Sequence, residues 1–213
     1  MTSMEATIDL PKPRERILET ATRLFYRQGY RAVGIDTIIK ESGVAKMSLY
    51  KHFPSKDDLI IAYLEQVNDG FFNWIESLTA GIKTPCEKLE VIFENIGARA
   101  ASVACLGCPF GAAAVEFPEL DHPAHATALR HKTRVLELLQ DLSTQAKARN
   151  PRALAESLML VMDGAWQTSR MFGPAGHAGR ASDAARVLIA AHLKYKVRLK
   201  KLQVSNITGN QHR

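Results

Sequence analysis

Apolar residues recur along the chain with the period of amphipathic helices. Between residues 14 and 28 they share one stripe, formed by Ile17, Leu18, Ala21, Leu24 and Phe25. Gly29 follows directly, and glycine is a common C-cap because it tolerates left-handed backbone angles. The pattern therefore predicts a first helix that begins near Arg14 and ends at Gln28.

Two shorter apolar patterns follow, and each is typical of a short helix. The first predicts a helix over residues 35–42. The second predicts a third helix whose inner face is formed by Ala45, Leu49 and Phe53. Pro54 cannot continue that helix, so we expect it to end there.

Longer helical patterns fill the rest of the chain. Ser55 and Asp58 have the spacing of a capping box, which predicts a fourth helix from Lys56 to about Leu78. Further helical windows lie near residues 86–104, 122–149, 151–172 and 181–202. We expect a solvated connecting segment to carry the acidic residues Glu116, Glu119 and Asp121. No stretch alternates like a strand, so the predicted fold class is all-α, with a small helical head and a larger helical body.

The second and third helices are joined by a tight turn at Gly43, which fits a helix-turn-helix. If Leu49 faces inward, the outer face of the third helix carries Met47, Ser48, Tyr50 and Lys51, with Lys46 and His52 at its flanks. Hydroxyls and ammonium groups bond phosphate oxygens and base edges, and a helix fits the major groove of DNA. Periodicity alone leaves a second interpretation open, an amphipathic helix with a solvated polar face on any all-α protein.

Composition and charge narrow the class of protein. The chain has 213 residues, of which 46% are hydrophobic, enough for a sizeable core. Its formal charge of +6 comes from an excess of basic residues at the two ends, with a net charge of +2 over residues 1–60 and of +6 over residues 190–213, which hold no acidic residue. Basic tails are often only solvated, so this charge does not by itself indicate a nucleic-acid partner. We find no signal-peptide pattern and no membrane-spanning window, and the odd number of cysteines favours a reducing, cytoplasmic location.

Residues 43–56, GVAKMSLYKHFPSK, resemble the DNA-binding signature of the TetR family of bacterial regulators. The preceding residues 14–30 and the stretch 35–39 are also similar to that family. Gly34 stands where the family usually has threonine, which removes one hydroxyl near a phosphate, and Ile39 stands where alanine is usual. The resemblance implies a helix-turn-helix DNA-binding domain over residues 14–60 and a ligand-binding and dimerisation domain over residues 61–203. Residues 1–13 and 204–213 are then expected to be a flexible arm and a flexible tail.

The resemblance also implies roles for individual residues. It implies a homodimer that binds a near-palindromic operator in double-stranded DNA, and a repressor released from it by a small organic ligand. The implied DNA contacts are Thr37, Lys46, Met47, Ser48, Tyr50, Lys51, His52 and Lys56. The last two helices imply a dimer interface of Leu154, Leu158, Val161, Met162, Leu188, Ile189, His192 and Leu193. Candidates for the pocket are Phe71, Trp74, Phe93, Phe110, Phe117, Met159, Trp166 and Phe172, although core packing explains apolar residues of this kind equally well.

Two alternatives to this interpretation remain open. Cys105 and Cys108 form a CxxC pair, which is compatible with a redox-responsive regulator. No second pair of cysteines or histidines has metal-ligand spacing, so we predict no metal site. No GxSxG, phosphate-binding glycine loop or HExxH occurs, so an enzyme is not expected. A helical interaction protein without DNA is the second alternative, and it predicts no salt-dependent binding to any duplex.

Overall fold

The computed structural model describes residues 11–193, and within this range the chain forms only helices and their connections. The predicted all-α class is therefore confirmed. The α-helices are α1 (Pro13–Gln28), α2 (Ile35–Ser42), α3 (Lys46–His52), α4 (Lys56–Thr79), α5 (Pro85–Ala100), α6 (Pro109–Glu116), α7 (Pro123–Gln145), α8 (Pro151–Phe172) and α9 (Ala181–His192). Most of the predicted arm, the basic C-terminal end and the predicted tail lie outside the described residues. No described helix is long and apolar enough to span a membrane.

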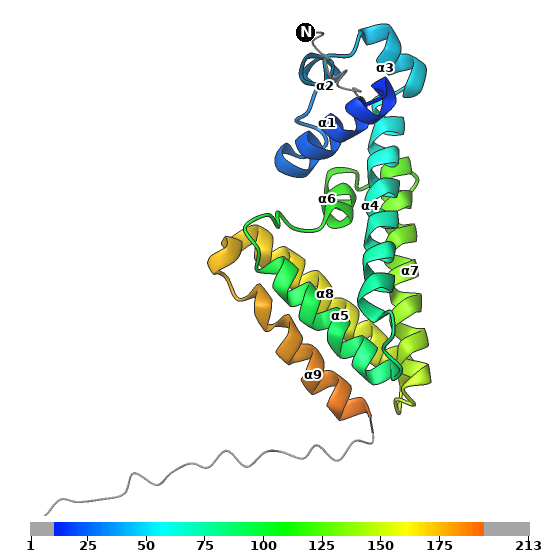
Figure 1. Cartoon of the computed structure of the whole chain (residues 1–213), viewed down its shortest axis with the longest axis vertical. Coiled ribbons are helices and arrows are strands. Elements are labelled where there is room, and N and C mark those ends of the chain that lie inside the picture. The colour runs from blue at the N-terminus through cyan, green and yellow to red at the C-terminus, as the bar shows by residue number, and fades with distance from the viewer. Residues whose placement is uncertain (1–10, 194–213) are drawn as a thin grey trace, which may run out of the picture.

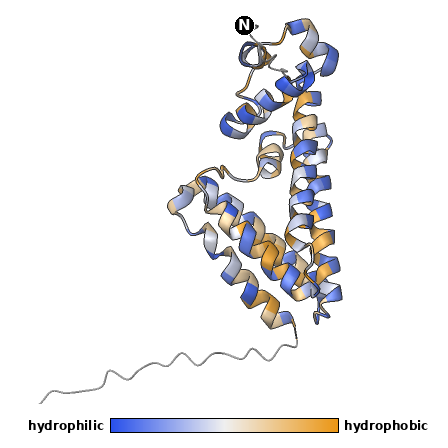
Figure 2. Ribbon diagram, in the orientation of Figure 1, coloured by the Kyte–Doolittle hydropathy of each residue, from blue (hydrophilic) through white to orange (hydrophobic). Residues whose placement is uncertain are grey.

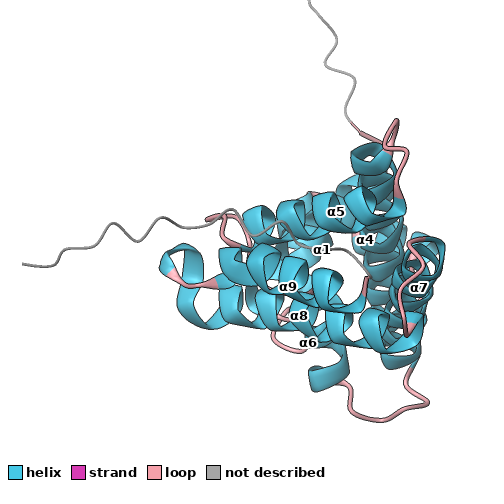
Figure 3. Cartoon of the chain, turned by 90° about the horizontal axis from the view of Figure 1, so that it is seen from below, coloured by secondary structure: helices cyan, strands magenta, loops and turns pink. Residues whose placement is uncertain are grey.

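The helices form a head, a long connecting helix and a body (Figure 1). Helices α1 to α3 lie together at one end, and α4 runs from this head along α7 to the opposite end. Helices α5, α8 and α9 pack beside one another in the body, which Figure 3 shows from below. Helix α6 lies between the head and the body, so it is placed to connect them.

Two hydrophobic cores hold this arrangement together. The first joins the head to the beginning of α4, to α6 and to the beginning of α7, and it contains Phe25, Tyr30, Leu49, Tyr63 and Phe117. The second lies among α5, α7, α8 and α9, where hydrophobic residues gather in Figure 2. Because the first core includes residues of α6 and α7, the head is packed against the body and not merely tethered to it. The division of the chain at residue 60 stays a prediction.

Three sequence predictions about local structure are wrong. Ala45 is exposed and precedes α3, because Val44, which is 6% exposed, fills the inner position instead. The apolar window over residues 86–104 ends as a helix at Ala100, and the separate helix α6 follows. Glu116 ends that helix, and its carboxylate is bonded to the head, so it is not part of a solvated loop.

The turn between α2 and α3 depends on Gly43. Its φ of 62° lies in the left-handed region, where a side chain is strained. A Cβ at this position would lie 2.9 Å from Nη2 of Arg16. That nitrogen donates a 2.5 Å hydrogen bond to the carbonyl oxygen of Ser42, which ties α1 to the turn. Glycine is therefore required here by backbone geometry and by the approach of Arg16.

Substituting Gly43→Ala is expected to lower the free energy of unfolding by about 2 kcal/mol, as measured by urea denaturation. Gly81→Ala is the matched control, because Gly81 also has a positive φ of 77° but a Cβ added there would meet no atom within 4 Å. In the control the free energy of unfolding should fall by only about 1 kcal/mol, which is the cost of a side chain at a positive φ without a steric contact. Equal losses in the two variants would show that the contact with Arg16 does not constrain the turn.

Candidate nucleic-acid interface and effector cavity

The outer face of α3 is a polar surface fixed from beneath. Leu49 and Phe53 are 0% and 3% exposed and anchor the helix in the first core. On the other side Met47 is 87% exposed and Tyr50 is 42% exposed. A seven-residue helix held in this way presents its outer side chains in a defined register, as recognition of a groove requires.

The remaining predicted DNA contacts surround this face. Thr37, Lys46 and Lys51 are exposed, whereas Ser48 and His52 are partly covered. The ammonium of Lys46 lies 3.7 Å from the carboxylate of Asp36, but both side chains are well exposed, so this pair constrains Lys46 little.

Lys56 lies apart from these residues, at the beginning of α4. Its ammonium donates a long bond of 3.4 Å to the carbonyl oxygen of Arg31, and partial burial lowers its pKa. The Ser55 hydroxyl already accepts the amide of Asp58, as the capping box predicted. Other first-turn amides of α4 remain available to an anion beside Lys56.

Glu116 connects α6 to the head. One carboxylate oxygen accepts a 3.0 Å bond from the amide of Tyr30, and the other accepts a 2.7 Å bond from the amide of Arg31. Nε of Arg31 donates back to the carbonyl oxygen of Glu116 at 2.7 Å. A Cβ on Gly29 would lie 2.8 Å from the same carboxylate, so the carboxylate sits directly against the end of α1.

Two tyrosines make the same connection. The Tyr26 hydroxyl accepts the amide of Leu106 at 2.8 Å and donates to the carbonyl oxygen of Gly107 at 3.3 Å. The Tyr30 hydroxyl donates to the carbonyl oxygen of Pro109 at 2.9 Å. Burial raises the pKa of both tyrosines, so they remain protonated donors. The head is therefore bonded to residues 106–116 at several points.

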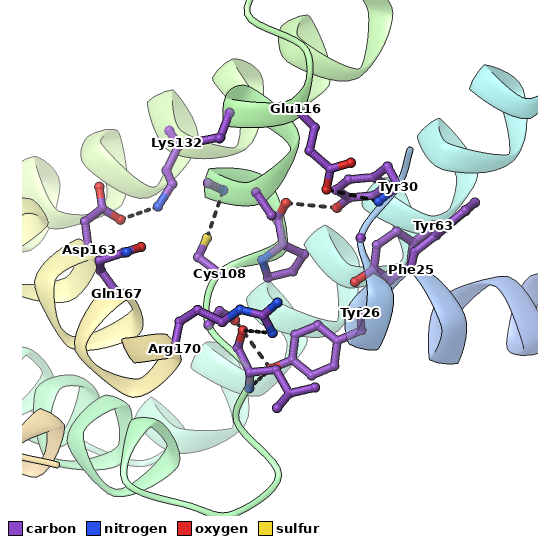
Figure 4. A pocket seen from close by; sticks show the side chains of 17 residues that line it. Phe25, Tyr26, Tyr30, Tyr63, Cys108, Glu116, Lys132, Asp163, Gln167 and Arg170 are labelled. Atoms are coloured by element: carbon purple, nitrogen blue, oxygen red, sulfur yellow. Dashed lines mark hydrogen bonds and ion pairs between the residues drawn. The ribbon is translucent and has the colours of Figure 1, made fainter. Parts of the chain in front are cut away.

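Two cavities adjoin this segment on either side. One of about 490 Å³ lies between the end of α1, α6 and α8, and Figure 4 shows the side chains that line it. The other, of about 400 Å³, lies among α1, α4, α5, α7 and α8. Both are lined by Gly107, Cys108, Pro109 and Lys132, and both have the size of small-molecule sites. We refer to the second as the aromatic cavity, because its wall includes Tyr26, Tyr63, Phe71, Phe110 and Trp166.

The predicted pocket residues divide into two groups. Phe71, Phe110 and Trp166 line the aromatic cavity. The other five line neither of these two cavities. Phe93 and Phe117 are packed in the two cores, Trp74 lies under the guanidinium of Arg99, Met159 packs against the second core, and Phe172 is 57% exposed. Hydrophobic periodicity identifies buried residues, but it does not separate a core wall from a cavity wall.

Polar groups between the cavities form a paired set, visible in Figure 4. Lys132 forms an ion pair with Asp163. Burial alone would lower the pKa of Lys132, but the neighbouring Cys108 and Asp163 raise it overall, so the ammonium stays charged and its charge is balanced. The Cys108 sulfur accepts the amide of Gly111 at 3.4 Å and caps α6.

The cysteines and histidines of the described residues show no ligand set. Cys86, Cys105 and Cys108 are free thiols, and Cys105 is buried. No group of three or more His, Cys, Asp or Glu side chains within residues 11–193 is placed to hold a metal ion. The hypothesis that Cys105 and Cys108 form a redox pair stays a prediction.

The predicted dimer residues require a correction. Five of them are at most 7% exposed and pack in the second core of the same chain, so they offer no surface to a partner: Leu154, Leu158, Met162, Ile189 and Leu193. Val161, Leu188 and His192 are partly covered. Other apolar residues of α8 and α9 are exposed: Leu160 at 75% and Val187 at 69% within the helices, and Met171 and Phe172 at the end of α8. The sequence stripe was the inner face of each helix, and Leu160 and Val187 lie on the opposite side.

Several residues of the site have no sequence signal that marks them. Glu116 and Lys132 look like ordinary charges in the sequence, and Tyr26 and Tyr30 look like core aromatics. Their partners lie far along the chain, 86 residues away for the bond from Tyr30 to Glu116. Pro109 occupies the first position of α6, where proline is common, so it is the local signal that could have marked the beginning of this helix.

The chain joins a helix-turn-helix head to a helical body that contains cavities, and comparison with known proteins identifies the family to which this architecture belongs. Residues 17–63 match the family described as "Bacterial regulatory proteins, tetR family", and residues 85–185 match "Tetracyclin repressor-like, C-terminal domain". The structure is similar to SCO4454, a TetR-family transcriptional regulator from Streptomyces coelicolor, with a TM-score of 0.80 and 30% identity. That similarity covers 84% of this chain and 95% of the other. The chain belongs to the TetR family, as the resemblance in residues 14–60 predicted.

Two curated relatives come from Bacillus subtilis (strain 168). The HTH-type transcriptional regulator LmrA is 35% identical over 105 residues, which cover 48% of this chain and 56% of LmrA. The uncharacterized HTH-type transcriptional regulator YxaF is 31% identical over 119 residues, which cover 55% of this chain and 62% of YxaF. The matches thus span less than two thirds of the length of either relative.

Proposed function

We propose that the chain is a homodimeric, DNA-binding transcription regulator, a repressor that a small organic ligand releases from its operator. The observation that carries the proposal is the outer face of α3, polar and exposed above the buried anchors Leu49 and Phe53. Membership of the TetR family supports the same function, which is regulatory and not enzymatic.

On this proposal α3 enters the major groove. Lys46, Met47 and Ser48 reach base edges, and Tyr50 and Lys56 hold phosphate oxygens beside it. Phosphate contacts release counterions, so the affinity falls steeply with salt concentration. Two heads in a dimer then bind half-sites about one helical turn apart, roughly 34 Å.

The dimer forms through the exposed faces of α8 and α9. Leu160 and Val187 provide large apolar side chains there, and the exposed Gly164 allows close approach of a partner helix. A face of this kind is unfavourable in water and becomes stable when a second copy covers it. The two-fold symmetry of such a dimer matches a near-palindromic operator.

The ligand acts through residues 106–116. This segment lines both cavities, and its backbone and Glu116 carry the bonds to Tyr26, Tyr30 and Arg31 in the head. A ligand that binds better when the segment has shifted favours a head position unsuited to the operator. The ligand can change DNA occupancy only to the extent that its affinity for the shifted arrangement exceeds its affinity for the arrangement that fits the operator.

Substituting Lys56→Ala is expected to weaken binding to every duplex by a similar factor, because a phosphate contact carries no sequence information. Its slope of log affinity against log salt should fall in magnitude by about one. Ser48→Ala and Lys46→Ala should instead change the preference between the operator and single-base variants of it. Fluorescence anisotropy with operator and random duplexes at two salt concentrations measures both effects. Equal losses on operator and random DNA for all three variants would contradict this division of roles.

A further inference from the structure

One polar side chain in the wall of the aromatic cavity lacks a second partner. His131 on α7 is 6% exposed, and its ring is stacked on Phe110 with centroids 3.6 Å apart and planes 6° apart. Phe71 and Phe72 form edge-to-face pairs with the imidazole, and their ring centroids lie 5.3 and 5.9 Å from its centroid. These contacts fix the plane of the imidazole, so its two nitrogens have defined directions.

The first of these nitrogens is fully accounted for. Nδ1 lies 3.0 Å from Oδ1 of Asn68, and the Asn68 amide nitrogen donates to Asp69 at 3.1 Å. Since the amide nitrogen is engaged with Asp69, the oxygen of Asn68 faces His131 and accepts from Nδ1–H. The neutral ring therefore carries its proton on Nδ1, and Nε2 is a hydrogen-bond acceptor.

Nε2 has no hydrogen-bond partner among the described residues. No fully buried side-chain nitrogen or oxygen in the described part of the chain lacks a partner, so Nε2 must border open space. Asn68, the partner of Nδ1, lines a separate surface hollow beside α4 and α7, not the aromatic cavity. His131 lines both the hollow and the aromatic cavity. Its Nε2 lies across the imidazole from Nδ1, so the bond of Nδ1 to Asn68 at the hollow places Nε2 toward the aromatic cavity.

The ring stays neutral at physiological pH. Burial lowers the pKa of His131 to about 3, and the positive charges of Lys132 and Arg134 act in the same direction. The residues lining the aromatic cavity include no carboxylate, and of its two cations Lys132 is paired with Asp163. The other, Arg99, is exposed and lies over the ring of Trp74, where water screens its charge. The cavity thus offers aromatic walls and one acceptor, with little net charge to attract an ion.

We propose that the aromatic cavity binds an uncharged, planar aromatic compound bearing a hydroxyl group, whose O–H donates to Nε2 of His131. The ring of the ligand packs against Phe71, Phe110 and Trp166, and the hydroxyl completes the hydrogen bonding of the imidazole. This inference rests on the proposed function only in taking the cavity for the effector site, and it specifies the chemical class of the effector.

Three naphthalenes test the inference on the full-length protein by isothermal titration calorimetry at pH 7. We expect 2-naphthol to bind about tenfold more tightly than 2-methoxynaphthalene, which keeps the rings but cannot donate, and more tightly than 2-naphthoate. In His131→Phe, which keeps an aromatic ring beside Phe110, the preference for naphthol over its ether should fall to within about twofold. His177→Phe is the matched control, because His177 is exposed and lines neither of the two cavities nor the surface hollow. This variant should keep the full preference for naphthol.

Equal affinity for naphthol and its ether in the wild type, or tightest binding of the naphthoate, would overturn the inference without any variant. A preference that survives in His131→Phe would overturn it as well. Parallel anisotropy titrations with DNA separate the two proposals. A protein that binds an operator but shows no hydroxyl preference contradicts only this inference, and one that prefers naphthol but binds no duplex contradicts only the regulator proposal.

Discussion

Substituting Val187→Asp in α9, alone or with Leu160→Asp in α8, is expected to convert the dimer to monomers. Both side chains are mostly exposed in the single chain, so the charge costs little in the monomer. In the proposed dimer each charge would be buried against a partner copy, which costs several kcal/mol without a compensating ion pair. Loss of the dimer removes the second head, and operator affinity should fall by at least about a hundredfold. Analytical ultracentrifugation and anisotropy measure the two effects.

Leu120→Asp is the control for this change. Leu120 is 75% exposed like the other two, but it lies in the connection between α6 and α7. It should leave both the mass of the protein and its operator affinity unchanged. A Val187→Asp protein that remains dimeric would place the interface elsewhere on the molecule.

The second large effect is expected from Glu116→Ala at the end of α6. The substitution removes both acceptors of the Tyr30 and Arg31 amides, which are charge-assisted bonds of 3.0 and 2.7 Å. We expect these two amides to exchange with solvent at least about tenfold faster, because local opening no longer breaks those bonds. The head then loses part of its fixed orientation, and operator affinity should fall by about tenfold. Hydrogen exchange followed by mass spectrometry, with anisotropy, tests both statements.

Glu119→Ala provides the comparison for Glu116. Glu119 is exposed, and no side-chain bond joins it to another described residue. Its removal takes away one negative charge close to Glu116 but no bond to the head. Similar exchange rates in the two variants would mean that the carboxylate of Glu116 does not hold the head.

Local signals in the sequence were sufficient to predict the helices and the turn of the head. The apolar spacing of α1, the glycine of the turn, Pro54 and the Ser55–Asp58 box each act within a few residues, and each predicted the element that the structure contains. The error at Ala45 arose because the buried residue, Val44, lies just before the helix, where a periodic pattern no longer applies.

The body was less predictable because its site depends on contacts between distant residues. Periodicity identified the stripe of α8 that contains Leu154, but only packing against α5 and α7 shows that this stripe faces the core of the same chain and not a partner. Sequence spacing gave His131 no metal-ligand register and indicated no other role for it. Its Nε2 could be identified as a hydrogen-bond acceptor only because the structure shows Nδ1 of the same ring bonded to Asn68, 63 residues earlier in the chain.

The regulator proposal is tested most directly by selection of genomic fragments with the purified protein, followed by anisotropy titrations of the enriched sequences at two salt concentrations. We predict a near-palindromic site that is bound by a dimer, with an affinity that falls steeply with salt and is largely lost in Tyr50→Ala. Tyr50 is 42% exposed, so the substitution should remove a contact surface without unfolding the head. No enriched sequence and no salt-dependent binding would contradict the proposal, and the interpretation as a helical interaction protein would then be favoured.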